Sequence, residues 1–154
     1  MVNNLALSGA SPIVIASGLS SEFTEFDLHF ESMSLNGTDD ILIQLGSGGL
    51  FALVANYLTR SSRTFNAAAT EAVSSANGFI IKGTAAAGLL RGTLNLKKFP
   101  AGANGDFWAI SGSLFGDNMG VNNSNIVCSG TGNFTFAFST LDGLRLATSG
   151  ANGF

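Results

Sequence analysis

The stretch EFTEFDLHFESMSL, from Glu22 to Leu35, decides the fold class because its polar and apolar residues alternate. Phe26, Leu28 and Phe30 share one parity, and acidic residues or histidine stand between them. Successive side chains of a β-strand point to opposite faces, so the pattern predicts a strand with one buried and one wet side. The dipeptide Asn36–Gly37 follows and is a strong turn signal.

The next segment, ILIQLGSGGL from Ile41 to Leu50, ends with three glycines within four positions. Such a cluster can cradle a phosphate or form a turn. A phosphate loop requires a lysine, a Ser or Thr for Mg²⁺ and a following helix. Here the first basic residue is Arg60, and Phe51 stands where G-x-G-x-x-G requires glycine. The sequence therefore predicts a strand and a tight turn, in which glycine supplies a positive φ.

The two-residue period recurs along the chain and predicts further strands over 50–58, 78–84, 90–99, 106–115, 133–139 and 141–148. Residues 61–77 are the least periodic part and are predicted to form a loop, as are residues 116–125. About eight or nine short antiparallel strands result, which fits an all-β sandwich or jelly roll. We assign residues 1–17 to an N-terminal arm or attachment segment and residues 18–154 to the β-sandwich domain.

The composition is poor in charge. Of 154 residues, 11% are charged and 45% are apolar, and the length suffices for one domain with its own core. Low charge suits an all-β protein with many turns, and also a protein whose surface is partly covered in an assembly. The net charge of −3 argues against nucleic acid as a partner. We expect no membrane insertion, and the N-terminus is a poor signal peptide because it lacks a basic region.

The charges are also unevenly distributed. Before Arg60 there are six acidic residues and no Lys or Arg, whereas 60–98 holds six basic residues and one acid, Glu71. Our first interpretation is that these are two solvated sheet faces. The alternative is electrostatic complementarity between neighbouring subunits.

The single histidine and the single cysteine limit the possible chemistry. His29 shares one strand face with Glu25, Asp27 and Glu31. We predict that this polar row lies at the surface or at a subunit seam, with a cation site or a pH-sensitive contact as the functional alternatives. Cys128 excludes an internal disulfide and a Cys-based metal cage, and we expect it to be a small buried residue. We assign no catalytic residue, no metal ligand and no cofactor.

The remaining acids are poor candidates for a hydrolase. Glycoside hydrolysis needs two carboxyl groups held a few ångströms apart across a cleft. We instead predict turn or capping roles for Asp39, Asp40, Asp106, Asp117 and Asp142.

Aromatic residues suggest one tentative binding feature. Trp108, the only tryptophan, is a candidate platform for a glycan, although its alternating segment favours a core position. Phe134, Phe136 and Phe138 alternate strictly and are predicted to lie in the core or on the axis of an oligomer.

Three segments, taken in order, resemble a domain family of bacteriophage virion proteins. They are FTEFDLHFESMSLNGTDDILIQLGSGGL (23–50), DFWAISGSLFGD (106–117) and STLDGLRLATSGANGF (139–154). In that family such blocks recur near the C-terminal end of tail-fibre, tail-spike and head-fibre proteins. The resemblance covers most of the chain from Gly18 onward, and the order of the motifs is more specific than any one of them. Relatives usually carry a polar run ending in Gly-Tyr after the first block, and a further strand after the Gly-x-x-Phe; this chain has Tyr57 near the first place and stops at Phe154.

The resemblance implies a tumour-necrosis-factor-like or jelly-roll knob, often trimeric, located in the virion. We therefore expect a non-enzymatic structural protein that decorates the capsid or tips a fibre. Its expected partners are its own copies as a homotrimer, other virion proteins and a host-surface glycan. The alternative is a lectin-like or glycan-processing module of a phage tail.

Overall fold

The computed structural model describes residues 12–17, 24–47, 49–51, 57–65, 69–83, 88–99, 106–117, 123–134 and 143–154. Within these ranges the chain forms eleven strands and no helix. The strands are β1 (Ile13–Ser17), β2 (Glu25–Met33), β3 (Ile41–Ser47), β4 (Leu50–Phe51), β5 (Tyr57–Phe65), β6 (Ala69–Ser75), β7 (Phe79–Ile81), β8 (Leu89–Phe99), β9 (Asp106–Asp117), β10 (Asn123–Phe134) and β11 (Gly143–Thr148).

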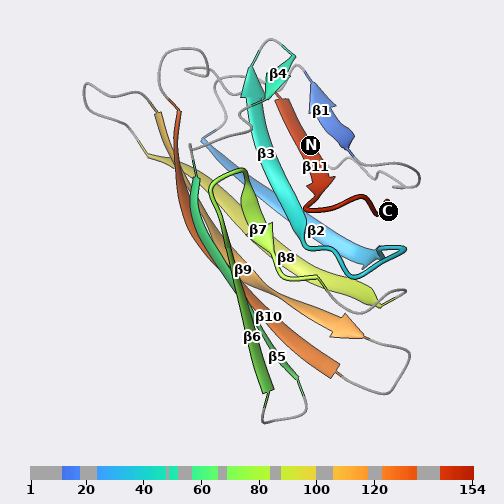
Figure 1. Ribbon diagram of the computed structural model, residues 1–154. Coiled ribbons are helices and arrows are strands. Elements are labelled where there is room, and N and C mark those ends of the chain that lie inside the picture. Colours follow the sequence, from blue (N-terminus) through green and yellow to red (C-terminus); the bar gives the residue numbers. More distant parts are fainter. Residues whose placement is uncertain are drawn as a thin grey trace.

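The strands make two sheets, and every strand pair is antiparallel. The larger sheet has the order β2-β8-β9-β10-β5-β6. In the smaller sheet β1, β11 and β3 are neighbours, and β4 and β7 both pair with β3. Figure 1 shows the small sheet lying across the upper part of the large one. The prediction of an all-β sandwich is confirmed, and its jelly-roll form stays a prediction.

Four details differ from the sequence prediction. The number of strands is eleven, more than the eight or nine expected. Residues 61–77 were predicted to be a loop, but β5 and β6 pair there from Thr59↔Ser75 to Phe65↔Ala69. Within the predicted arm 1–17, Ile13–Ser17 pairs with β11 as β1. The loop predicted over 116–125 is likewise shortened at both ends, because β9 and β10 extend into it.

The segment Ile41–Leu50 forms a strand and a turn, as predicted. β3 pairs with β4 through Gly46↔Phe51 and Ser47↔Leu50. Gly49 lies between them with φ +79°, a conformation that a residue with a side chain adopts only at a cost. The glycine cluster therefore closes a hairpin.

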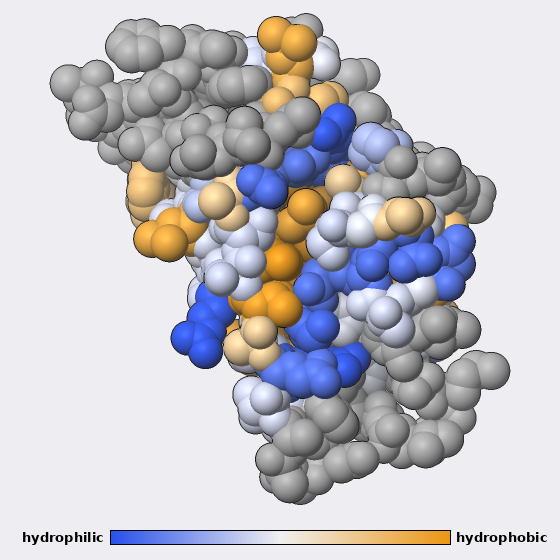
Figure 2. All heavy atoms as spheres, viewed as in Figure 1, coloured by the Kyte–Doolittle hydropathy of each residue, from blue (hydrophilic) through white to orange (hydrophobic). Residues whose placement is uncertain are grey.

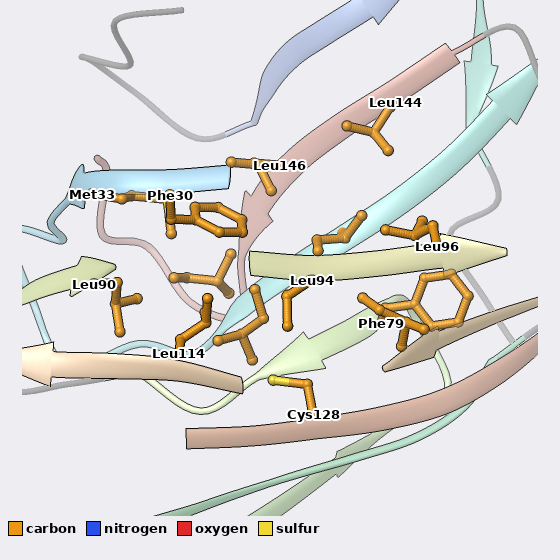
Figure 3. Packing of buried hydrophobic residues seen from close by; sticks show 14 of the residues in the cluster. Phe30, Met33, Phe79, Leu90, Leu94, Leu96, Leu114, Cys128, Leu144 and Leu146 are labelled. Carbon is orange, nitrogen blue, oxygen red and sulfur yellow. The ribbon is translucent and has the colours of Figure 1, made fainter. Parts of the chain in front are cut away.

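The core lies between the two sheets (Figure 3). β3 and β11 supply alternate apolar residues from one side, and β2, β8, β9 and β10 supply theirs from the other. The largest completely enclosed side chains include Trp108, Phe79 and Leu94. Because both layers contribute apolar rows, the alternation seen in the sequence is matched by alternating burial along β2 and β8.

Two glycines allow β8 and β9 to approach closely at the core. Gly92 pairs with Leu114, and Gly112 pairs with Leu94. Both have positive φ, +134° and +148°. A Cβ on Gly112 would lie 2.5 Å from the carbonyl oxygen of Thr93. These two positions therefore require glycine on grounds of conformation and of space.

The C-terminal residues are fastened to the loop between β2 and β3. Asn36 receives a hydrogen bond from the Gly153 N–H at its side-chain oxygen (2.9 Å), and its own N–H donates to the Gly153 carbonyl (3.1 Å). The Asn152 N–H donates to the Asp39 carboxylate at 2.9 Å. Phe154 packs against the core. This clasp joins the first and the last of the three segments described above.

Candidate functional site

The predicted polar row lies on β2, at one edge of the six-stranded sheet. Glu25, Asp27, His29 and Glu31 are all exposed, and the residues between them, Phe26, Leu28 and Phe30, are partly or fully buried. The row therefore lies on the outer face of the sheet, and its assignment to a subunit seam stays a prediction.

The contacts of the row reach across to the neighbouring strand β8. The Asn95 side-chain N–H₂ group donates to Glu25 at 2.8 Å and to Asp27 at 2.9 Å. Lys97 Nζ is 3.8 Å from Glu25, and about half of each side chain remains exposed. An ion pair of that kind contributes less than about 1 kcal/mol, so these contacts order a wet surface without stabilising it much.

The histidine of the row does not complete a catalytic arrangement. His29 Nδ1 lies 2.9 Å from the Thr93 hydroxyl. A hydroxyl nucleophile and its base normally need a third group that orients the imidazole, and no residue of the described ranges makes such a contact to the other ring nitrogen. In the same ranges no three His, Cys, Asp or Glu side chains are grouped to hold a metal ion.

Trp108 is not a glycan platform. Its side chain is 1% exposed, and its ring stacks on Phe26 with a centroid distance of 5.7 Å. The indole belongs to the core because β9 turns its even-numbered residues toward the small sheet. The prediction of a sugar platform is therefore wrong, and the core alternative is confirmed. Of the predicted Phe134, Phe136 and Phe138 row, the last two lie outside the described residues.

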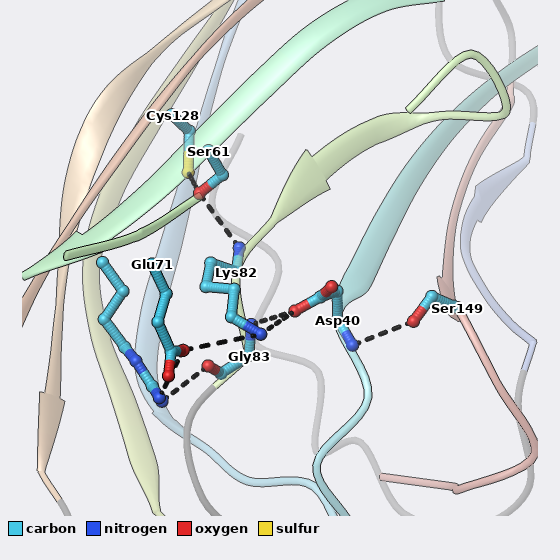
Figure 4. A network of polar contacts seen from close by, with 8 residues as sticks. Asp40, Ser61, Glu71, Lys82, Gly83, Cys128 and Ser149 are labelled. Atoms are coloured by element: carbon cyan, nitrogen blue, oxygen red, sulfur yellow. Dashed lines mark hydrogen bonds and ion pairs between the residues drawn. The ribbon is translucent and has the colours of Figure 1, made fainter. Parts of the chain in front are cut away.

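Asp39 and Asp40 belong to the loop that leads into β3, and they have structural contacts. Asp40 Oδ1 accepts hydrogen bonds from Lys82 Nζ (3.0 Å) and from the Gly83 N–H (2.8 Å). The Asp40 N–H donates to the Ser149 hydroxyl at 3.0 Å. Figure 4 shows these contacts joining the end of β7 to the start of β3. Both carboxylates therefore hold together segments that are distant in the sequence, which differs from the predicted turn or capping role.

Two of the other predicted turn acids, Asp106 and Asp117, are the first and last residues of β9. The turn role of the third, Asp142, stays a prediction, because this residue lies outside the described residues. The network in Figure 4 also contains Glu71, which accepts a hydrogen bond from Arg63 at 2.8 Å and lies 3.8 Å from Lys82. The second ion pair contributes little, because Glu71 is partly exposed.

Cys128 is buried on the inner face of β10, as predicted. Its Sγ lies 3.4 Å from the Ser61 hydroxyl, which in turn accepts a hydrogen bond from the Lys82 N–H. Burial raises the pKa of Cys128 to about 11, although the contact with Ser61 acts in the opposite direction. The thiol is therefore protonated and enclosed at neutral pH, which is the opposite of a reactive cysteine.

One feature of the outer face of the large sheet was not predicted from the sequence. Each of its four central strands exposes one large apolar side chain there: Phe99 (42% exposed), Phe115 (63%), Val127 (49%) and Leu58 (80%). Phe99 also contacts Phe107 edge to face. In the view of Figure 2, apolar surface forms a central strip between hydrophilic side chains, with further apolar patches at the top and at the left.

The small residues between these apolar groups make the outer face open at its centre. Ser111 of β9 stands opposite Asn95 on one side and Ser129 on the other, and Ser129 stands opposite Arg60 of β5. The face therefore carries short hydroxyl side chains in the middle and large side chains around them.

The comparisons with known proteins identify no relative. No protein-family model, no curated protein and no solved structure matches the chain. No helix in the described ranges is long and apolar enough to cross a membrane.

Proposed function

We propose that this chain is a non-enzymatic structural protein of a bacteriophage virion, a trimeric knob of the jelly-roll type. It decorates the capsid or tips a fibre, and it works by contact between surfaces. The observation that carries the proposal is the outer face of the six-stranded sheet, where Phe99, Phe115, Val127 and Leu58 are exposed on four adjacent strands.

Exposed apolar side chains on one face favour an assembled protein. Single exposed apolar residues are normal on a monomer, whereas contiguous apolar patches mark interaction sites. Here each of four adjacent strands exposes one such residue, and the strand pairing spaces them across the face, with Phe99 opposite Phe107 and Phe115 opposite Arg91 and Asn125. Among the described residues, four of the five exposed large apolar side chains lie on this face; the fifth, Leu50, lies on β4 of the other sheet. The low charge content of the chain points the same way.

The positions of the resemblance motifs also support a structural role. The Asn36–Gly37 turn of the first motif binds Gly153 of the third motif through two hydrogen bonds. The second motif, DFWAISGSLFGD, forms β9 and contributes Trp108 and the conformationally restricted Gly112. The motif residues thus build and fasten the sandwich, which is what a scaffold requires, and none of these contacts assembles a reactive group.

Native mass spectrometry of the purified protein at micromolar concentration tests the oligomeric state. We expect a species of three times the 15.8 kDa chain mass. A stable 15.8 kDa species with no higher oligomer would refute the trimer, and a dimer would indicate face-to-face pairing in place of a closed ring.

Matched serine variants identify the surface involved. Phe115→Ser and Val127→Ser should lower the oligomer fraction, because both remove apolar area from the proposed contact face. Leu50→Ser removes an equally exposed apolar side chain from the other sheet and should leave the oligomer unchanged. Equal effects of all three variants would contradict the assignment to this face. Imaging of an intact virion with antibody against the chain then distinguishes capsid from tail.

A second candidate function, glycan binding, is favoured by one observation. Phe115 is exposed and stands directly opposite Arg91 of β8 and Asn125 of β10, which are exposed as well. An aromatic face between two hydrogen-bonding side chains matches the apolar and hydroxyl surfaces of a sugar ring. Glycan-array binding that Phe115→Ala abolishes would favour this function, and absence of binding would remove it.

A further inference from the structure

The outer face of the five-stranded sheet holds one arginine in a fixed position. Arg145 of β11 donates from Nε to the side-chain oxygen of Gln44 at 2.7 Å. Gln44 is only 4% exposed, and its own N–H₂ group donates to the Asn77 carbonyl at 2.7 Å. The amide is therefore unable to turn freely, and its oxygen stays directed at the guanidinium.

An aromatic ring supports the same guanidinium. The Arg145 Cζ atom lies 4.8 Å from the centroid of Phe51, which belongs to β4. Gly46 and Gly143 make room for this ring, because a Cβ on either would lie 2.7 Å or 3.3 Å from ring atoms of Phe51. A cation–π contact and a hydrogen bond from two different strands thus restrict both the position and the plane of the group.

No acidic side chain of the described ranges balances this charge. Arg63, Lys82 and Lys97 each form an ion pair, whereas Arg145 makes none there. Burial lowers the pKa of Arg145. The neighbouring Tyr57 is neutral at physiological pH, because burial raises the pKa of its hydroxyl. A partly desolvated cation without a counter-ion is unfavourable, and an anion bound at this position would offset that cost.

We propose that Arg145 forms a binding site for a carboxylate ligand on the outer face of the small sheet. With Nε engaged by Gln44, the two Nη groups remain as a pair of parallel donors. That pair matches the two oxygens of a planar, singly charged carboxylate. A phosphate dianion is a poorer match, because its sites usually combine several cations or backbone N–H groups, and Arg145 has no second cation among its contacts here.

The site is independent of the proposed virion function and lies on the other sheet from the proposed contact face. It also does not depend on the trimer, because all three elements that hold the guanidinium come from one chain. Failure of one proposal therefore leaves the other unaffected.

The test is a titration of ¹⁵N-labelled protein followed by the Arg145 Nε–H signal and the backbone amides of Gln44 and Gly143. The probes are sodium acetate and sodium glucuronate, with chloride at matched ionic strength as the reference. We expect a saturable shift with a Kd on the order of millimolar, as suits one solvent-accessible bidentate contact. No saturation, or an equal shift at Arg60 and Arg91, would overturn the proposal. Tighter saturation by inorganic phosphate would overturn the choice of carboxylate.

Three variants distinguish ligand binding by Arg145 from a purely structural role of this residue. Arg145→Lys keeps the charge but removes the planar donor pair and should abolish saturation at the Gln44 and Gly143 amides. Arg60→Lys is the matched control and should bind as the wild type does. Phe51→Leu should weaken binding about two- to five-fold by removing the cation–π contact. If Arg145→Lys binds acetate as tightly as the wild type, the inference is wrong.

Discussion

The outer faces of the two sheets have opposite character. Along β2 of the large sheet, outward residues are exposed and inward residues are partly or fully buried. Along β3 of the small sheet, Ile41 to Gly46 are all buried, so this strand is covered on both faces, whereas Arg145 of the neighbouring strand β11 is partly exposed. The outward apolar residues Leu42, Ile80 and Ala147 form a second small cluster, against which Val73 of β6 packs.

This difference determines whether the polar residues of each face need hydrogen-bond partners within the protein. On the open face, Asn95 and its acidic neighbours can exchange partners with water at little cost. On the covered face, Gln44 must find its partners within the protein, because an unsatisfied buried amide costs about 1–3 kcal/mol. Polar groups on the large sheet are therefore replaceable, whereas those on the small sheet are fixed by their contacts.

Truncation of the two large aromatic residues of β9 should show the largest contrast. Trp108 points to the core and Phe115 to the open face. We expect Trp108→Ala to lower the free energy of unfolding by about 3–5 kcal/mol. Phe115→Ala should change it by less than about 0.5 kcal/mol when urea unfolding is measured at dilutions where the chain is monomeric. A loss above about 2 kcal/mol for Phe115→Ala would mean that the outer face is not open.

Two glycine substitutions distinguish the cost of a steric clash from the cost of a positive φ alone. Gly112→Ala should cost about 2–4 kcal/mol, because its Cβ would meet the Thr93 carbonyl at 2.5 Å and its φ is positive. Gly49→Ala also has positive φ but no atom within 4 Å, so it should cost only about 1–2 kcal/mol. Thermal unfolding of both variants gives the comparison, and equal losses would argue against a close approach of β8 and β9.

Alkaline pH should lower the free energy of unfolding, because the buried thiol of Cys128 ionises. Its folded pKa of about 11 exceeds the value of about 8.5 in an unfolded chain. The folded state therefore holds this proton more tightly, and the corresponding stability is complete below about pH 8.5 and is lost as pH rises to about 11. The loss amounts to about 3 kcal/mol.

Urea unfolding of the wild type and Cys128→Ala between these pH values measures that contribution. The variant should show a flatter dependence of stability on pH, although Tyr57 still contributes in the same direction at higher pH, because its pKa is also raised by burial. Identical slopes for both proteins would show that the thiol is not enclosed.

The smallest contrast concerns the two amides. Gln44→Leu removes the partners of Arg145 Nε and of the Asn77 carbonyl and should cost about 1–3 kcal/mol. Asn95→Leu removes the exposed contacts with Glu25 and Asp27 and should change stability by less than about 0.5 kcal/mol. Urea unfolding of the two variants decides whether the small sheet is covered on its outer side; comparable losses would mean that it is not.

The sequence predicts strands well where apolar residues mark the inner face. β2 and β3 were recognisable for this reason. β5 was missed because hydroxyl groups occupy its buried positions: Thr59 donates to the carbonyls of Gly78 and Ser75, and Ser61 contacts Cys128. Because these hydroxyl groups have hydrogen-bond partners, they are compatible with burial. In the sequence, however, Ser and Thr are typical of a loop.

β10 was missed for a related reason. Gly130 faces Thr59 so closely that a Cβ there would lie 2.6 Å from the threonine Cβ. A strand whose inner face is partly glycine has no apolar period to detect. The contacts of Arg145 with Gln44 and Phe51 were not predictable from the sequence either. Both residues belong to other strands, and only the sheet register brings them next to Arg145.

The candidate polar row was located correctly on one exposed face, since the period of a single strand suffices for that. The exposed apolar residues of the large sheet were not located from the sequence. Phe115 and Val127 look like core residues until the pairing of β9 and β10 shows which alternate residues point outward.

The clasp between the β2–β3 loop and the last residues has a consequence for synthesis of the chain. Asp40 and Ser149 are 109 positions apart, and Asn36 and Gly153 are 117 apart. β3 therefore leaves the ribosome long before β11, the strand that covers one of its edges. Until then an apolar strand has an unpaired edge, and a nascent chain in that state is prone to pair with other chains. Contacts of such long range also make folding slow, so the small sheet can close only after β11 has been made.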